Sequence, residues 1–116
     1  MKQRAAVEAL LEGRAAAPAV DAALAELPLE TFLELLARGL QDALRALAAD
    51  ALRGPRGRAL LTGLDEVQGA LRAVAAGANP QPELARATLL GGLEARLGER
   101  AADAKLRSVF SPVTRV

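Results

Sequence analysis

Residues 29–53 read LETFLELLARGLQDALRALAADALR, and their apolar residues recur at steps of three and four. This spacing places side chains on one face of an α-helix. The apolar face consists of Leu29, Phe32, Leu33, Leu36, Leu40, Leu44, Leu47 and Ala51. The opposite face is charged, and Glu34, Arg38 and Asp42 are spaced for i,i+4 ion pairs. We therefore predict one long amphipathic helix over Leu29–Arg53.

Helices are also expected on both sides of this segment, because Gly and Pro divide the rest of the chain into apolar runs. The expected helices span Gln3–Glu12, Pro18–Leu27, Arg58–Ala76 and Pro82–Leu97, with a further short helix over Glu99–Arg107. Gly13, Pro28, the break at 54–57 and the segment 77–81 separate them. The sequence thus predicts one helical domain over 1–107, with a frayed, flexible tail over 108–116.

The composition supports an all-α fold with no strands. The chain has 116 residues, of which 28 are Ala and 22 are Leu, and both residues are strong helix formers. Only seven Val and four Thr are β-branched, and no Ile is present. No segment of useful length alternates between polar and apolar residues, as a half-buried strand would. We therefore predict a bundle of five to six helices with short Gly/Pro loops.

Two glycine positions inside these helices call for an explanation, since Gly costs about 1 kcal/mol relative to Ala within a helix. Gly39 lies in the middle of the long helix, where close packing against a neighbouring helix or a slight bend would account for it. Gly91 and Gly92 interrupt the helix expected over Pro82–Leu97. They suggest either a close helix crossing or a weak point.

The residue types exclude many kinds of chemistry. The chain has no Cys and no His, which removes the usual zinc, haem and transition-metal ligand sets and also Ser/His/Asp and Cys/His catalysis. No phosphate-binding glycine motif is present. We expect no enzymatic activity, no catalytic or metal-ligating residues and no cofactor.

Charge and hydropathy indicate what kind of partner the protein has. Fifteen Lys and Arg balance 14 Asp and Glu, so the net charge of +1 gives no broad basic surface for nucleic acid. No run reaches the 18 apolar residues of a membrane span. Glu8 and Glu12 interrupt the apolar run that a signal peptide would need. We expect a cytoplasmic protein with protein partners, no membrane contact and no direct nucleic-acid binding.

The apolar stripes of the last two predicted helices are the candidate interaction residues. In the first of these, the stripe has the 4, 3, 4, 3 spacing of a heptad seam. The eight candidates are Leu60, Leu64, Val67, Leu71, Val74, Leu89, Leu90 and Leu93. The sequence leaves open whether each belongs to the core of the chain or to an interface. Helices built of Ala and Leu bury little area each, which favours an assembled state.

Arg53, Arg56 and Arg58 cluster between the two longest predicted helices. They could contact an anion such as a phosphate or an acidic partner. The alternative, which we favour, is that they compensate the charge at a helix C-terminus and solvate a loop. No aromatic residue lies nearby to stack on a base, which argues against single-strand binding.

One family resemblance emerges from these segments. The stretch ALRAVAAGANPQ at 70–81, followed by Leu84 and by Leu89-Leu90-x-x-Leu93, resembles the C-terminal helical domain of bacterial DNA polymerase III clamp-loader subunits of the delta-prime and gamma/tau types. In those subunits a helix ends in an Asn-Pro-containing turn, and a Leu-rich last helix follows. The pattern FLxLLxxxLxDxL at 32–44 is similar to the long helix of the same family.

The resemblance implies a collar role in DNA replication, in which helical domains of several subunits pack in a ring and hold their ATPase modules together. Such a collar neither hydrolyses ATP nor reads DNA sequence. The residues alone also allow a free-standing homo-oligomeric adaptor or regulator. A helical nucleic-acid binder that uses the three arginines and the tail cations Lys105, Arg107 and Arg115 is a further alternative.

Overall fold

Six helices make up the described part of the chain, and no strand occurs there. The structure is a computed structural model that describes the backbone of residues 2–114 and the side chains of residues 2–98. The helices are α1 (Lys2–Leu11), α2 (Ala17–Leu24), α3 (Leu29–Arg45), α4 (Ala49–Leu52), α5 (Pro55–Ala75) and α6 (Pro82–Thr114). The prediction of an all-α bundle with short loops is confirmed.

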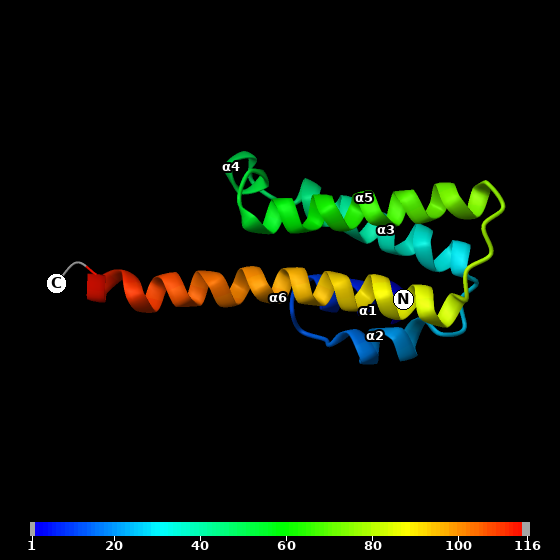
Figure 1. Cartoon of the computed structure of the whole chain (residues 1–116), viewed down its shortest axis with the longest axis horizontal. Coiled ribbons are helices and arrows are strands. Elements are labelled where there is room, and N and C mark those ends of the chain that lie inside the picture. The colour runs from blue at the N-terminus through cyan, green and yellow to red at the C-terminus, as the bar shows by residue number, and fades with distance from the viewer. Residues whose placement is uncertain (1, 115–116) are drawn as a thin grey trace.

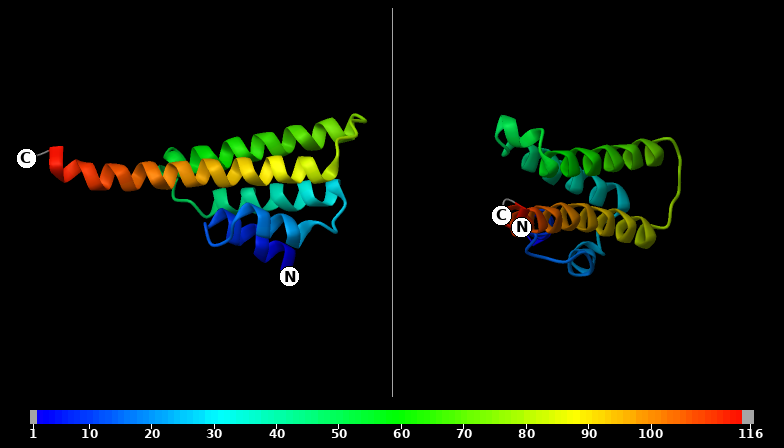
Figure 2. Two further views of the ribbon diagram at one scale, coloured as in Figure 1. Left: turned by 60° about the horizontal axis from the view of Figure 1, so that its bottom comes forward. Right: turned by 60° about the vertical axis from the view of Figure 1, so that its left-hand side comes forward.

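Helix α6 is the central element of the bundle. In Figure 1 it runs along the molecule with α3 and α5 on one side, α2 on the other and α1 behind it, and it contacts all four. The right-hand view of Figure 2 again has α3 and α5 on one side of α6, and in the left-hand view α6 lies between α5 and α3. The C-terminal part of α6 runs past the ends of the other helices, and it accounts for the elongated dimensions of 58 × 26 × 25 Å.

The core is formed by the predicted apolar faces. On α3, the residues Phe32, Leu33, Leu36 and Leu40 are at most 1% exposed, and Leu44 and Leu47 pack against them in half-buried positions. The other helices contribute the buried apolar residues Val7, Leu10, Leu11, Ala17, Val20, Leu24, Ala59, Leu60, Val67, Leu90 and Leu93. Every long helix therefore turns one Leu- or Val-containing face to a shared interior.

The helix expected over Leu29–Arg53 is in fact two helices, so this boundary was wrong. Helix α3 ends at Arg45, and the chain turns through an extended Ala48 before the four-residue α4. Neither Gly nor Pro marks this turn. The apolar period continues through it because Leu47 packs on the core from the turn itself. The turn lets α5 run back along α3, and that tertiary contact outweighs local helix propensity.

Helices α1 and α5 each end in a Schellman motif, at the two glycines that the sequence analysis predicts as helix ends. Gly13 has a φ of 76° and Gly77 a φ of 101°, values that favour glycine. After α5, the N–H of Ala78 donates to the carbonyl of Ala73 (2.9 Å) and the N–H of Gly77 to that of Val74 (3.0 Å). These two bonds satisfy carbonyls that would otherwise lack partners at the helix end.

The break expected at 54–57 is shorter than predicted, because α5 already begins at Pro55. Proline suits this first-turn position, where its missing N–H would have no helical partner. Gly57 is buried in the first turns of α5 against the end of α4. A Cβ on Gly57 would overlap the backbone carbonyl of Leu52, so the approach of the two helices requires glycine here.

The glycines inside the helices divide into two groups. Gly39 meets α1, and a Cβ there would lie 2.6 Å from Val7 Cγ1, so the predicted close packing is confirmed. Gly63 packs in the same way against Leu93 of α6. By contrast, a Cβ on Gly91 or Gly92 would meet no atom within 4 Å. The close crossing considered for this pair is therefore not formed within the chain.

Helix α6 does not end near Leu97 but continues to Thr114. The separate helix expected over Glu99–Arg107 is thus part of α6, because Gly98 does not interrupt the backbone hydrogen bonds. Residues 108–114 are also helical backbone, while 115–116 lie outside the described residues. The flexibility predicted for the tail concerns motion, and it stays a prediction.

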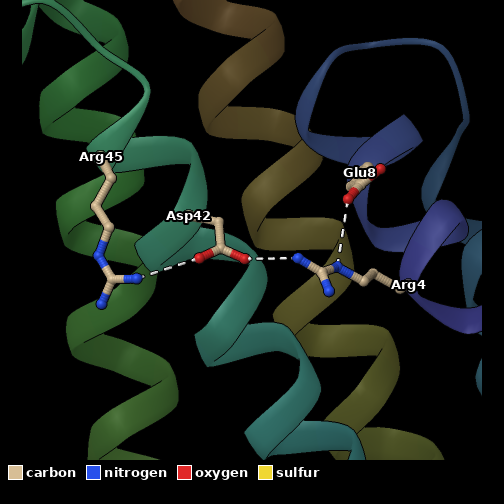
Figure 3. Close-up of polar contacts among 4 residues, drawn as sticks. All are labelled: Arg4, Glu8, Asp42 and Arg45. Atoms are coloured by element: carbon tan, nitrogen blue, oxygen red, sulfur yellow. Dashed lines mark hydrogen bonds and ion pairs between the residues drawn. The ribbon is translucent and has the colours of Figure 1, made fainter.

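The solvent face of α3 forms ion pairs other than those predicted. Asp42 accepts from Arg45 (3.4 Å) and from Arg4 of α1 (3.1 Å), and Arg4 also lies 3.5 Å from Glu8 (Figure 3). The predicted partner Arg38 makes no ion pair within the described side chains. A contact between helices has thus replaced the local i,i+4 pairs, which contribute only about 0.2–0.5 kcal/mol each.

Candidate functional site

An apolar groove lies where the N-terminal end of α3, the C-terminal end of α5 and the N-terminal end of α6 meet. Its volume is about 360 Å³. It is lined by Leu29, Leu33, Ala70, Ala73, Val74, Ala78, Pro80, Gln81, Leu84, Ala85, Thr88 and Leu89. Gln81 and Thr88 are its only polar lining residues, and no lining residue carries a charge. The groove therefore suits an apolar partner surface.

The local sequence explains why the groove is open. The Schellman motif at Gly77 ends α5, and the segment 78–81 carries the chain across to α6 without helical structure. Pro82 then starts α6, since proline is favoured in a first helical turn. At this connection α5 and α6 no longer cover each other, so the Ala and Leu residues beside it remain accessible to solvent.

Leu84 forms the exposed rim of the groove. Its 64% exposure is the highest among the large apolar residues whose side chains are described, ahead of Leu61 at 50% and Leu52 at 36%. Leu89 is half-buried and Leu90 is fully buried on the same helix. Leu84 lies nearly opposite Leu93 around the helix, since nine residues correspond to about two and a half turns. Leu84 was not among the predicted interaction residues, because its departure from the buried stripe of α6 is recognised only once that stripe is placed in the core.

The eight candidate interaction residues occupy two environments. Leu60, Val67, Leu90 and Leu93 are at most 2% exposed and belong to the core. Leu64 and Leu71 are half-buried and pack against that core. Val74 and Leu89 are also half-buried, but they line the groove. The structure thus brings two of the eight to the groove.

Of the three clustered arginines, Arg56 compensates the charge at a helix C-terminus, as the favoured interpretation predicts. Arg56 donates from Nη1 to the carbonyl of Leu11 at 3.0 Å, at the C-terminal end of α1. This is the end of a helix where positive charge is stabilising. Arg53 caps α4, and both it and Arg58 are exposed.

A second cavity, of about 460 Å³, lies beside Arg56 between the α1–α2 connection and α6. Its four charged lining residues already have partners within the chain, and two of them, Glu12 and Arg14, pair with each other at 2.8 Å. Arg56 is bonded to Leu11, and Glu94 accepts from the backbone N–H of Ala17 at 2.6 Å. These internal bonds leave this cavity a weaker candidate for a ligand site than the apolar groove.

Two polar contacts between α2 and α6 were missed by sequence reasoning. The contact of Glu94 with Ala17 caps α2, whose own N-cap residue, Ala16, has no side chain able to do so. Arg86, only 6% exposed, donates to Asp21 at 2.7 Å. Both pairs lie more than 60 positions apart in the chain, so no local spacing could reveal them.

A surface ion pair joins α5 and α6. Arg96 donates a hydrogen bond to Glu66, and this bond holds the pKa of the Glu66 carboxyl below its ordinary value of 4.5. Desolvation acts in the opposite direction, and the charge of Arg96 adds to the lowering. The pair is partly exposed, so it fixes the relative position of the helices only weakly.

The described residues include no group of three or more His, Cys, Asp or Glu that could hold a metal ion. No described helix has both the length and the apolar character needed to cross a membrane. Comparison with known proteins found no matching family, no matching curated protein and no matching solved structure.

Proposed function

We propose that this chain is a non-catalytic helical assembly module that binds an apolar helix of a protein partner in the groove at Leu84. A helix docks into an apolar groove through side chains spaced at three and four residues, and the open groove offers Leu and Ala surface to such side chains. The observation that carries the proposal is the 64% exposure of Leu84 at the rim of an uncharged lining.

The exposure of Leu84 has a cost that binding would remove. Burying a leucine side chain contributes roughly 1.5–3 kcal/mol, so the groove forgoes this free energy in the isolated chain. A single exposed leucine needs no explanation, but one that borders a groove lined by nine other apolar residues marks an interaction surface.

The specific form of the proposal is a clamp-loader collar domain in DNA replication. Its support is the sequence resemblance at 32–44 and 70–93, together with the helical fold that such a domain requires. The Asn-Pro turn of the resemblance lies directly beside the groove, because Pro80 and Gln81 line it. The partner would then be a neighbouring helical domain of another clamp-loader subunit.

The test is binding to purified clamp-loader ATPase subunits, measured by co-elution in size-exclusion chromatography. The variant Leu84→Glu places a charge on the rim and should abolish co-elution, because an unpaired buried charge is strongly unfavourable. Leu61→Glu makes the same chemical change at an exposed position on α5 outside the groove, and it should leave co-elution unchanged.

Each result decides one part of the proposal. If no subunit co-elutes, the collar role is wrong. If a subunit binds and both variants behave like the wild type, binding does not use the groove, and the site is wrong. Circular dichroism at 222 nm on both variants confirms that neither change has unfolded the helices.

A further inference from the structure

Helix α6 is longer than the bundle needs. It has 33 residues, which corresponds to about 50 Å of helix. Its N-terminal end forms one wall of the groove, and its C-terminal end runs past the other helices (Figures 1 and 2). The midpoint of α6 is Gly98, so the groove and the projecting end lie at similar distances on either side of it.

The projecting end of α6 extends beyond the other helices of the bundle. Most of the stability of a helix in a protein comes from tertiary packing of an apolar face. This segment also has the apolar residues Leu106, Val109, Phe110 and Val113 in its sequence. A helical segment of this composition is stabilised chiefly by packing against another element.

The side of α6 that faces away from the core is open along its described length. Leu84, Thr88, Ala95 and Gly98 are exposed, and a Cβ on Gly91 would meet no atom. These five positions follow steps of 4, 3, 4 and 3, so they form one stripe, which we call the outer face of α6. The outer face runs from the rim of the groove to the midpoint of the helix.

We propose that the outer face and the groove receive the projecting end of α6 from a second copy of this chain, in an antiparallel dimer. A two-fold axis near Gly98 places the projecting segment of each copy along the outer face of the other. The inference rests on the proposed function of the groove as a protein-binding site, and it identifies the partner as this chain itself. Such an isologous contact occurs twice and closes on itself.

The length of α6 sets the register of this dimer. With the axis between positions 98 and 99, position 91 lies opposite position 106 of the partner subunit, and position 88 lies opposite position 109 of the partner subunit. Position 95 lies opposite position 102 of the partner subunit. In this register the last turn of the partner's helix reaches the groove at Leu84. Packing of this kind would also account for Gly91, which no contact within the chain explains.

The contact area predicts a weak dimer. A strip about 45 Å long and about 10 Å wide on each copy comes to about 900 Å² in total, somewhat below the ~1,200 Å² at which stable specific interfaces begin. We therefore expect a concentration-dependent equilibrium between monomer and dimer, to be measured by sedimentation velocity from low micromolar to millimolar concentration. Leu84→Glu should weaken dimerisation at least about tenfold, because the charge would be buried without a partner. Leu61→Glu should leave it within about twofold.

Cysteine cross-linking tests the orientation, and the absence of native cysteine makes it unambiguous. An equimolar mixture of the single variants Ala95→Cys and Ala102→Cys should form a disulfide-linked dimer under mild oxidation. Ala95→Cys alone should not, because its two copies lie about 10 Å apart along the antiparallel helices, which is too far for a disulfide.

The possible outcomes separate this inference from the proposed function. Cross-linking of the mixture alone, together with loss of the dimer in Leu84→Glu, supports the antiparallel dimer. Efficient cross-linking of Ala95→Cys alone shows a parallel pair and overturns the register. A chain that stays monomeric at millimolar concentration overturns the dimer. If such a monomer still binds another protein in a way that Leu84→Glu abolishes, the proposed function stands without the dimer.

Discussion

Helix α6 is held by different chemistry on its two sides. Towards α2, two polar contacts determine the geometry: Arg86 with Asp21, and Glu94 with the backbone of Ala17. Towards α5, the contact is apolar and close, because Gly63 lets Leu93 approach the helix backbone. The ion pair between Arg96 and Glu66 on the α5 side is partly exposed.

The difference reflects how much apolar surface each neighbour offers. Helix α2 has eight residues and buries Ala17, Val20 and Leu24. Helix α5 has 21 residues, and its core face extends over most of its length. A short helix gains little free energy from burial, so hydrogen bonds determine its position. The position of a long helix is determined by how its apolar side chains pack. The five predictions below test this contrast.

The largest effect is expected on the α5 side. Leu93→Ala removes a side chain that is 2% exposed and leaves a cavity, so it should cost about 3 kcal/mol of unfolding free energy. Urea denaturation followed by circular dichroism measures this cost. Leu84→Ala, which truncates an exposed leucine on the same helix, should cost less than about 0.5 kcal/mol. If the two variants lost the same unfolding free energy, close apolar packing would not determine the contact between α5 and α6.

A double-mutant cycle sharpens the same point. Gly63→Ala alone should destabilise the chain by about 1 kcal/mol or more, because the added Cβ would overlap Leu93 Cδ2. In the background of Leu93→Ala, the same change should be stabilising, since the space is then free and Ala favours the helix by about 1 kcal/mol. Additive effects would contradict a direct contact between the two residues.

On the α2 side, Arg86→Met should cost about 1–2 kcal/mol. The change keeps most of the apolar stem but removes the charged hydrogen bond to Asp21, which remains partly buried. Urea denaturation of Arg86→Met and of the double variant Arg86→Met/Asp21→Asn measures this cost. The double variant should recover part of the loss, because no charge is then left unpaired. A neutral Arg86→Met would show that apolar contacts alone place α2.

Glu94→Ala should have a smaller and local effect of about 1 kcal/mol, the usual contribution of an N-cap. Hydrogen exchange of the Ala17 amide should become faster, while exchange in α5 stays unchanged. Glu94→Gln retains an acceptor oxygen and should preserve most of the protection. Uniformly faster exchange throughout the bundle would instead indicate that Glu94 supports the whole fold.

The smallest effect concerns Glu66 and depends on pH. Because Arg96 lowers the pKa of Glu66 in the folded chain, the stabilisation is present above the ordinary value of 4.5 and is lost as the pH falls through the folded pKa. Glu66→Gln should therefore cost up to about 0.5 kcal/mol at pH 7, as exposed pairs do, and nothing at pH 2. Urea midpoints of both proteins at the two pH values measure the difference. A cost that persists at pH 2 would reflect packing rather than charge.

Much of the fold could be predicted from residue spacing, and the errors have a common cause. The core positions on α3 and the glycine ends at Gly13 and Gly77 depend on interactions within a few residues, so local patterns predicted them. The end of α3 at Arg45 and the continuation of α6 past Gly98 depend on what the helices pack against. Local patterns contain no information about that packing.

The groove was only partly predictable. Val74 and Leu89 were candidate interaction residues, whereas Leu84 entered the sequence argument only as part of a family resemblance. The position of Leu84 away from the buried stripe of α6 becomes informative only once the structure shows that this stripe faces the core. The contribution of Ala78 and Pro80 to the lining depends on how the connection between α5 and α6 folds over the bundle.

Residue spacing and capping signals predict that this protein is built of helices, where α1 and α5 end and which face of each helix is apolar, because helix formation and capping involve residues a few positions apart. Tertiary structure alone decided which apolar residues stay exposed, which glycines are in contact and which distant charges meet. These features depend on contacts between segments that are far apart in the chain, such as Arg86 with Asp21 and Gly63 with Leu93.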